Sequence, residues 1–310
     1  MADAAACFHA SELREVKLPA GTVQYADLGP RDAPPLVFVH GVLANGNLWR
    51  KAARPLAARG VARCIVPHWP LGGHERPMAA GADLSIPGVV RLIASFLEAL
   101  DLRHVTLVGN DTGGALCQLV ATEHPDRLGR LVLTSCDAFD NFLPLMFRYL
   151  QWGSHVPGFI LASAQLLRIR AARRLPFAYG WLAKRPVADD ASDSVARPLL
   201  TNGGVRRDAA KVLSDISTRY TLAAAERLGD FKKPVLIAWS TEDRFFPREH
   251  AERLARLFKD ARLEWIDDAY TFAAEDNPER LVALIESFVT TRGPEAPADP
   301  ADAPGARRSG

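Results

Sequence analysis

Hydrophobic positions along the chain follow strand-like and helix-like periods in turn. Residues 12–18 and 22–28 alternate between apolar and polar side chains around Pro19-Ala20-Gly21, which predicts an antiparallel hairpin. Residues 35–40 form a continuous apolar run, typical of a strand buried on both faces. Further strands are predicted at residues 62–66, 105–108, 131–134, 234–239 and 262–266.

Helical periodicity separates most of these strands. Residues 49–59, 84–100, 248–258 and 278–289 carry apolar side chains at helical spacing. Strands that alternate with helices favour a parallel sheet with right-handed crossovers. The fold class predicted from this rhythm is α/β.

The rhythm changes between residues 139 and 228, where no buried strand is predicted and prolines interrupt helical segments. We interpret this stretch as an α-helical insertion that forms a cap. The chain then divides into a core (1–138), the cap (139–228), the rest of the core (229–292) and a tail (293–310). The tail is rich in Pro, Ala, Gly and charge, and is predicted to be disordered.

Composition narrows the classes of partner. The 310 residues are 48% hydrophobic with a net charge of +2, so neither nucleic acid nor an anionic membrane is expected as a partner. A small-molecule substrate is expected only from the resemblance described below. The sequence leaves the oligomeric state open. No nucleotide-binding or metal-ligand motif is present, so neither cofactor nor metal is expected. Four scattered cysteines, no secretory signal and no membrane-spanning run predict a cytoplasmic location.

The most informative stretch is residues 105–120, an apolar strand, a glycine-rich turn and a helix. Gly109-Asn110-Asp111-Thr112-Gly113 has the spacing of a nucleophile elbow, in which small neighbours let a strained turn present its central side chain. That side chain is Asp111. The alternative interpretation is a capped helix after a strand, because Asp and Thr are good caps.

The order of the elements resembles the α/β-hydrolase superfamily. Four landmarks carry the resemblance: His40-Gly41, the elbow at Asp111, Asp243 after a late strand, and residues 275–279 at the start of the last helix. The resemblance implies a mostly parallel eight-stranded sheet flanked by helices, with a helical cap. Asp at the elbow is similar to the epoxide hydrolase and haloalkane dehalogenase branch.

In that branch, the resemblance implies that the Asp111 carboxylate attacks an electrophilic carbon and forms an ester. Backbone N–H groups of Val42 and Thr112 would stabilise negative charge on the ester oxygen. A histidine steered by a carboxylate would then activate water. Here Thr271 stands where the family places that histidine, so Asp243 lacks its usual partner.

Other side chains are therefore considered for the missing base. The loop at residues 67–77 contains Trp69, a candidate substrate contact, and two histidines. We interpret His74 as a candidate base or substrate contact. His68 is interpreted as a structural hydrogen-bonding residue, and His40 as a residue that fixes the oxyanion loop and lies at the substrate site.

Tyrosines of the cap are candidates to hold an epoxide oxygen. Of Tyr149, Tyr179 and Tyr220, the first and last are favoured because they lie near the two ends of the insertion. Halide-binding features are absent, since Val42 and Thr112 occupy positions where dehalogenases place Asn or Trp. The sequence predicts an epoxide hydrolase-like enzyme; the alternatives are a non-hydrolytic acid–base enzyme and an inactive binding relative.

Overall fold

Eight strands form one sheet in the order β1-β2-β4-β3-β5-β6-β7-β8 in the computed structural model, which describes residues 5–291. Strands β1 and β2 pair antiparallel, β2 pairs antiparallel with β4, and all later neighbours are parallel. The strands are β1 Leu13–Leu18, β2 Gly21–Leu28, β3 Pro35–Val39, β4 Arg63–Pro67, β5 Val105–Asp111, β6 Leu128–Cys136, β7 Val235–Ser240 and β8 Ala261–Ile266. The predicted hairpin and mostly parallel sheet are confirmed.

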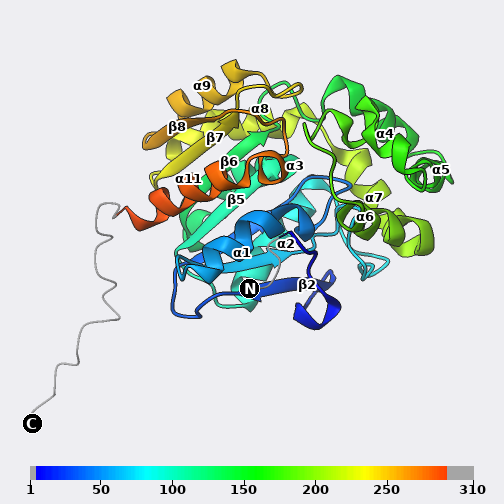
Figure 1. Cartoon of the computed structure of the whole chain (residues 1–310), viewed down its shortest axis with the longest axis horizontal. Helices are drawn as coiled ribbons and strands as arrows, with labels where there is room; N and C mark the ends of the chain where they lie inside the picture. The colour runs from blue at the N-terminus through cyan, green and yellow to red at the C-terminus, as the bar shows by residue number, and fades with distance from the viewer. Residues whose placement is uncertain (1–4, 292–310) are drawn as a thin grey trace, which may run out of the picture.

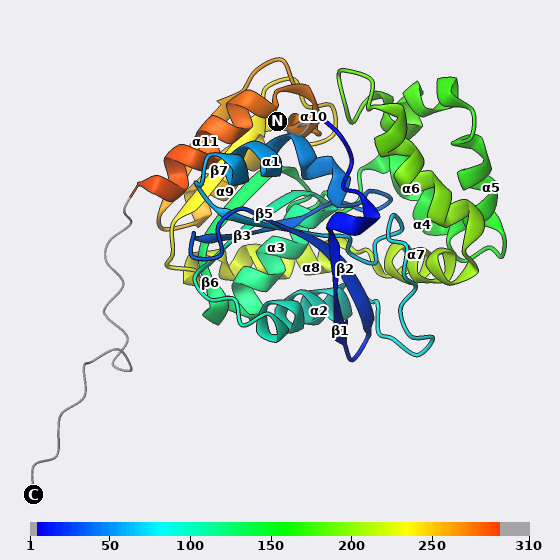
Figure 2. The ribbon, with the colours of Figure 1, turned by 60° about the horizontal axis from the view of Figure 1, so that its bottom comes forward.

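Helices cover both faces of the sheet (Figures 1 and 2). Helices α1 (Arg50–Ala58) and α11 (Pro278–Thr290) pack together on one face. Helices α2 (Ile86–Ala99), α3 (Thr112–Glu123) and α8 (Thr218–Arg227) cover the other face, and α9 (Arg248–Leu257) packs on β7 and β8. Strands β3 and β5, at the centre, are almost wholly buried, as their continuous apolar runs predict.

Between β6 and α8 the chain leaves the sheet and forms a separate helical layer at one end of the molecule (Figure 2). We call residues 145–215 the helical insert. It contains η4 Leu145–Phe147, α4 Arg148–Gly153, α5 Phe159–Leu166, η5 Arg170–Arg174, η6 Pro176–Gly180, α6 Asp189–Thr201 and α7 Gly203–Asp215. Helix α8 packs against α3, so it belongs to the core rather than to the predicted cap, whose boundary was placed at residue 228.

The helical insert is fastened to the core through its residues 182–185. The Asp276 carboxylate, in α10 (Ala273–Asp276), accepts hydrogen bonds from the backbone N–H groups of Lys184 at 2.8 Å and Arg185 at 2.9 Å. The backbone N–H of Phe272 also donates to the carbonyl of Leu182 at 2.7 Å. These bonds join the insert to the loop that follows β8.

The remaining features of the chain add little to the site. Short 3-10 helices occur at Ala10–Glu12 (η1), Gly46–Trp49 (η2), Pro125–Arg127 (η3) and Leu228–Asp230 (η7). Within residues 5–291, no helix combines the length and the apolar composition needed to cross a bilayer. The predicted tail at residues 293–310 lies outside the described part of the chain.

Candidate active site

A strained turn presents Asp111 at the carboxyl end of β5, where α3 begins. Asp111 has φ 54° and ψ −135°, a backbone conformation that a residue with a side chain rarely adopts. A Cβ at Gly113 would overlap the carbonyl oxygen of Val39, and a Cβ at Gly41 would collide with the Asp111 carboxylate. The turn therefore closes only because these two positions are glycine. This is the backbone geometry of a nucleophile elbow, with Asp at its central position.

A cavity of about 150 Å³ lies above Asp111, between the sheet and the helical insert. Its wall is mostly apolar, with Val42, Leu143, Leu182 and Phe272 among its residues. Of the described residues that line it, Asp111 alone carries a carboxylate, and none is a histidine, lysine or arginine. The cavity thus surrounds a single ionisable carboxyl with hydrocarbon.

The pKa of Asp111 is raised to about 7, mainly because the carboxyl is buried; the hydrogen bond from the backbone N–H of Thr112 opposes the rise, and the negative charge of Asp243 adds to it. Removal from water penalises the ionised carboxylate, and little of the cavity wall compensates for it. Asp111 is therefore divided between its acid and its base form near neutral pH. A group of that kind can both give and take a proton.

Two further buried carboxyl groups, Asp137 and Asp243, interact electrostatically with Asp111. Asp137, just after β6, is fully buried, and its Oδ2 accepts a hydrogen bond from the Thr112 hydroxyl at 3.2 Å. Burial, and then the charge of Asp111, raise the pKa of Asp137 well above its usual value. Burial likewise raises the pKa of Asp243. Throughout residues 5–291, none of these three carboxylates forms an ion pair, and no cluster of three His, Cys, Asp or Glu side chains could hold a metal ion.

Asp243 is held without an imidazole. Its Oδ1 accepts hydrogen bonds from the backbone N–H groups of Phe245 and Phe246, both at 2.8 Å. The Thr271 hydroxyl donates to the same oxygen at 3.2 Å. Thr271 is fully buried and does not line the cavity. A hydroxyl with no basicity near neutral pH thus takes the place beside Asp243 that the family resemblance assigns to a histidine.

The imidazole of His40 has structural hydrogen-bond partners. His40 accepts a hydrogen bond at Nε2 from the backbone N–H of Trp69 at 2.9 Å, while its Nδ1 lies 2.9 Å from the carbonyl of Gly41. Burial lowers the pKa of His40 to about 3 and that of His68 to about 4. Neutral His40 therefore holds the loop that carries Val42, as the sequence predicts. Neither His40 nor Trp69 lines the cavity, contrary to their predicted place in substrate binding.

His74 is not brought to Asp111. Its Nε2 lies 3.3 Å from Oδ2 of Asp208, a fully buried carboxylate of α7, and it is absent from the wall of the cavity. The same carboxylate oxygen accepts a hydrogen bond from the backbone N–H of Met78 at 2.7 Å. The prediction of His74 as the displaced base is corrected on this ground, because the imidazole fastens its loop to the helical insert.

The tyrosines that line the cavity are not the pair that the sequence favours. Tyr149 lines the cavity, and so does Tyr179, which the sequence analysis did not favour. The Tyr149 hydroxyl donates to the carbonyl of Phe177 at 3.0 Å, and that of Tyr179 donates to the carbonyl of Leu43 at 3.2 Å. Tyr220 instead bonds to Asp215 on the insert and does not line the cavity. No local signal distinguishes Tyr179 from the other two, because the folding of the insert decides which ring reaches the cavity.

Together the sheet order, the strained Asp111 turn and the insert define an α/β-hydrolase fold. The model of the alpha/beta hydrolase fold family matches residues 34–278, and the chain belongs to this family. The predicted fold class is confirmed.

The proteins similar to this chain are named for different activities within the family. The chain is 29% identical to haloalkane dehalogenase 2 of Mycobacterium tuberculosis over 292 residues, covering 86% of this chain and 92% of the relative. It is 24% identical to epoxide hydrolase 2 of Caenorhabditis elegans over 283 residues, covering 86% and 77%. An alpha/beta hydrolase fold protein from Burkholderia ambifaria superposes with a TM-score of 0.74 at 22% identity, covering 90% of this chain and 98% of that one.

Proposed function

We propose that the protein is an enzyme in which Asp111 exchanges a proton with a small, largely apolar substrate, leading to elimination, isomerisation or cyclisation rather than hydrolysis. The observation that carries the proposal is the lone carboxyl, with a pKa of about 7, on the floor of an apolar cavity. A carboxyl poised near the ambient pH is matched to general acid–base catalysis.

The surroundings of Asp111 favour proton transfer over hydrolysis of an ester. Hydrolysis would need a base to activate water, and no described residue that lines the cavity carries an imidazole or an amine. Burial, with a contribution from the negative charge of Asp243, disfavours full ionisation of Asp111. A partly protonated carboxyl is a weaker nucleophile but an effective proton donor. Loss of the histidine would then suppress water addition as a side reaction.

The test is turnover of a panel of small apolar epoxides, alkenes and carbonyl compounds in D₂O and, separately, in ¹⁸O-labelled water. For isomerisation or cyclisation we expect deuterium without ¹⁸O in the products, and for elimination neither label. Turnover should fall by at least about 10²-fold in Asp111→Asn. A plot of turnover against pH should have an inflection near pH 7, and Asp243→Asn should move that inflection to lower pH. His74→Ala is the control, and the pH of the inflection should be unchanged in this variant. Products that carry ¹⁸O would refute proton transfer without hydrolysis.

A second candidate is the nucleophilic chemistry of an epoxide hydrolase-like enzyme. It is favoured by the elbow conformation of Asp111 and by the similarity to epoxide hydrolase 2 and haloalkane dehalogenase 2. Against it, the hydroxyls of Tyr149 and Tyr179 already donate to backbone carbonyls, so they are not free to hold an epoxide oxygen. Intact-protein mass spectrometry after incubation with reactive epoxides separates the two candidates. A covalent adduct on Asp111 supports the nucleophile, and an unmodified protein with turnover supports proton transfer.

A binding protein without activity is the remaining alternative. It predicts ligands that raise the melting temperature equally in the wild type and in Asp111→Asn, without turnover. The acid–base enzyme predicts that ligands which engage the carboxyl stabilise the two proteins unequally.

A further inference from the structure

Charge is distributed unevenly along the chain, although its net value is only +2. Residues 141–188 contain seven arginines and lysines and no aspartate or glutamate. Since the whole chain has 38 basic and 36 acidic residues, the rest of the chain holds 31 and 36. Residues 141–188 are therefore cationic on a protein that is otherwise weakly anionic, although Arg170, Arg173, Lys184 and Arg185 pair with carboxylates outside the segment.

The same segment carries most of the exposed apolar surface. Of the nine large apolar side chains exposed within residues 5–291, eight lie between Leu145 and Phe177. We call six of them the outer patch: Leu145, Trp152, Val156, Leu166, Ile169 and Phe177. Leu145 and Trp152 are 76% and 68% exposed, which is unusual for such large groups.

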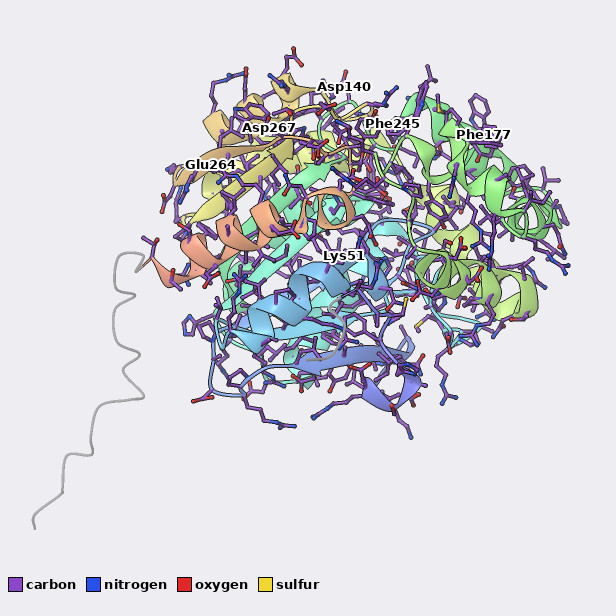
Figure 3. All side chains as sticks on the ribbon, in the orientation of Figure 1. Lys51, Asp140, Phe177, Phe245, Glu264 and Asp267 are labelled. Atoms are coloured by element: carbon purple, nitrogen blue, oxygen red, sulfur yellow. The ribbon has the colours of Figure 1, made fainter. Side chains whose placement is uncertain are left out.

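The outer patch lies at the far end of the insert, on and around α4 and α5 (Figure 1). Figure 3 labels Phe177 there, whereas Phe245 lies near the junction with the core. Leu166 and Phe177 are also part of the cavity wall above Asp111, together with half-exposed Tyr149. Two members of the outer patch are thus continuous with the wall of the cavity.

Unpaired guanidinium groups stand among these apolar side chains. In the described chain, Arg148, Arg168 and Arg174 are exposed and form no ion pair with a carboxylate. Arg148 lies one helical turn before Trp152, and Arg168 lies between Leu166 and Ile169. Apolar and aromatic side chains interspersed with arginine are the composition of segments that rest on an anionic lipid surface.

We propose that the outer patch docks on an anionic lipid bilayer, with the mouth of the cavity turned toward the membrane. The apolar side chains would enter the interface between headgroups and acyl chains, and the three arginines would contact lipid phosphates. A second copy of the chain is a poorer occupant, because a two-fold contact would bring arginine against arginine with no carboxylate of the segment to pair them. An apolar substrate dissolved in the bilayer would then enter the cavity directly.

The test is sedimentation of the purified protein with extruded vesicles of phosphatidylcholine, alone or mixed with phosphatidylglycerol, at low and high salt. We expect binding only to the mixed vesicles, weakened by salt. Each substitution Arg148→Gln or Arg168→Gln should weaken partitioning about fivefold, the worth of one arginine near an anionic surface. Trp152→Ser should weaken it as well.

Two matched controls and one independent variant complete the design. Leu222→Ser removes the one exposed large apolar side chain of the described chain outside the segment, and Arg256→Gln removes an exposed arginine of α9; both should bind like the wild type. All variants alter exposed side chains, and melting curves confirm that they fold. Asp111→Asn should also bind like the wild type, so this result is separate from the chemistry proposed above.

Three outcomes would overturn the proposal. They are absence of sedimentation with either vesicle at low salt, equal binding to both vesicles, and unchanged binding in the arginine variants. A dimer in light scattering that Trp152→Ser dissolves would assign the outer patch to a second copy instead.

Discussion

The pKa of Asp111 makes a prediction about stability that needs no substrate. An unfolded Asp111 ionises with the ordinary pKa of 3.8, whereas in the folded protein the pKa is about 7. Between these values the folded state binds more protons than the unfolded state, so the free energy of unfolding falls as pH rises through this window. Below this pH window the Asp111 carboxyl is neutral in both the folded and the unfolded state. Above the window it is ionised in both, and the full cost of burying the charge lowers the free energy of unfolding.

The size of the effect follows from the shift of about three pH units. At 1.36 kcal/mol per unit, ionised Asp111 destabilises the fold by about 4 kcal/mol above neutral pH. Asn at this position resembles the protonated carboxyl and cannot ionise. Asp111→Asn should therefore be more stable than the wild type by about that amount near pH 8, and about equally stable near pH 4.

Urea unfolding followed by tryptophan fluorescence across this pH range measures the difference. Asp140→Asn is the control, because the side chain of Asp140, labelled in Figure 3, is 83% exposed; its effect should stay within about 0.5 kcal/mol. Equal stability of Asp111→Asn and the wild type near pH 8 would refute the reasoning, because burial would then not penalise the charge. A loss of turnover with a gain of stability would identify Asp111 as a functional group.

Three further predictions concern the surroundings of the site. Arg50 is wholly buried and pairs with Glu275, so Arg50→Met should lower the free energy of unfolding by about 3–5 kcal/mol in denaturant titrations. Asp208→Ala removes the acceptor of the Met78 N–H and of His74, and should cost about 1–3 kcal/mol without moving the inflection of turnover against pH. Thr271→His would put an imidazole beside Asp243; we expect any adduct formed on Asp111 to hydrolyse faster in this variant, measured by intact mass over time.

Much of the sheet could be predicted because buried parallel strands are nearly continuous apolar runs. The predicted ends were less accurate. Strand β5 runs on to Asp111, beyond the predicted residue 108. Its polar end is stabilised by residues that are distant in sequence. The Asn110 amide donates hydrogen bonds to the carbonyls of Ser135 at 3.1 Å and Thr271 at 2.8 Å. No local pattern encodes those partners.

The candidate site shows the same division. The elbow at Asp111 could be predicted because its strain demands glycines at fixed positions nearby in sequence. The partner of His74 could not, because Asp208 lies 134 residues further along the chain. The choice of Tyr220 failed because nearness to the end of an insertion does not determine which ring faces the cavity. The cationic segment at residues 141–188 was likewise missed, because the net charge of the whole chain conceals its uneven distribution.

The hydrogen bonds that hold the helical insert to the core have a mechanical consequence. The insert is held at two separate places, at residues 182–185 by Asp276 and Phe272, and at α7 by the bonds that Asp208 forms with Met78 and His74. Helices α4 and α5 take part in none of these bonds. A ligand that reaches Asp111 is therefore expected to need a local shift of α4 and α5, beside Tyr149 and Phe177 of the cavity wall, rather than a swing of the whole insert.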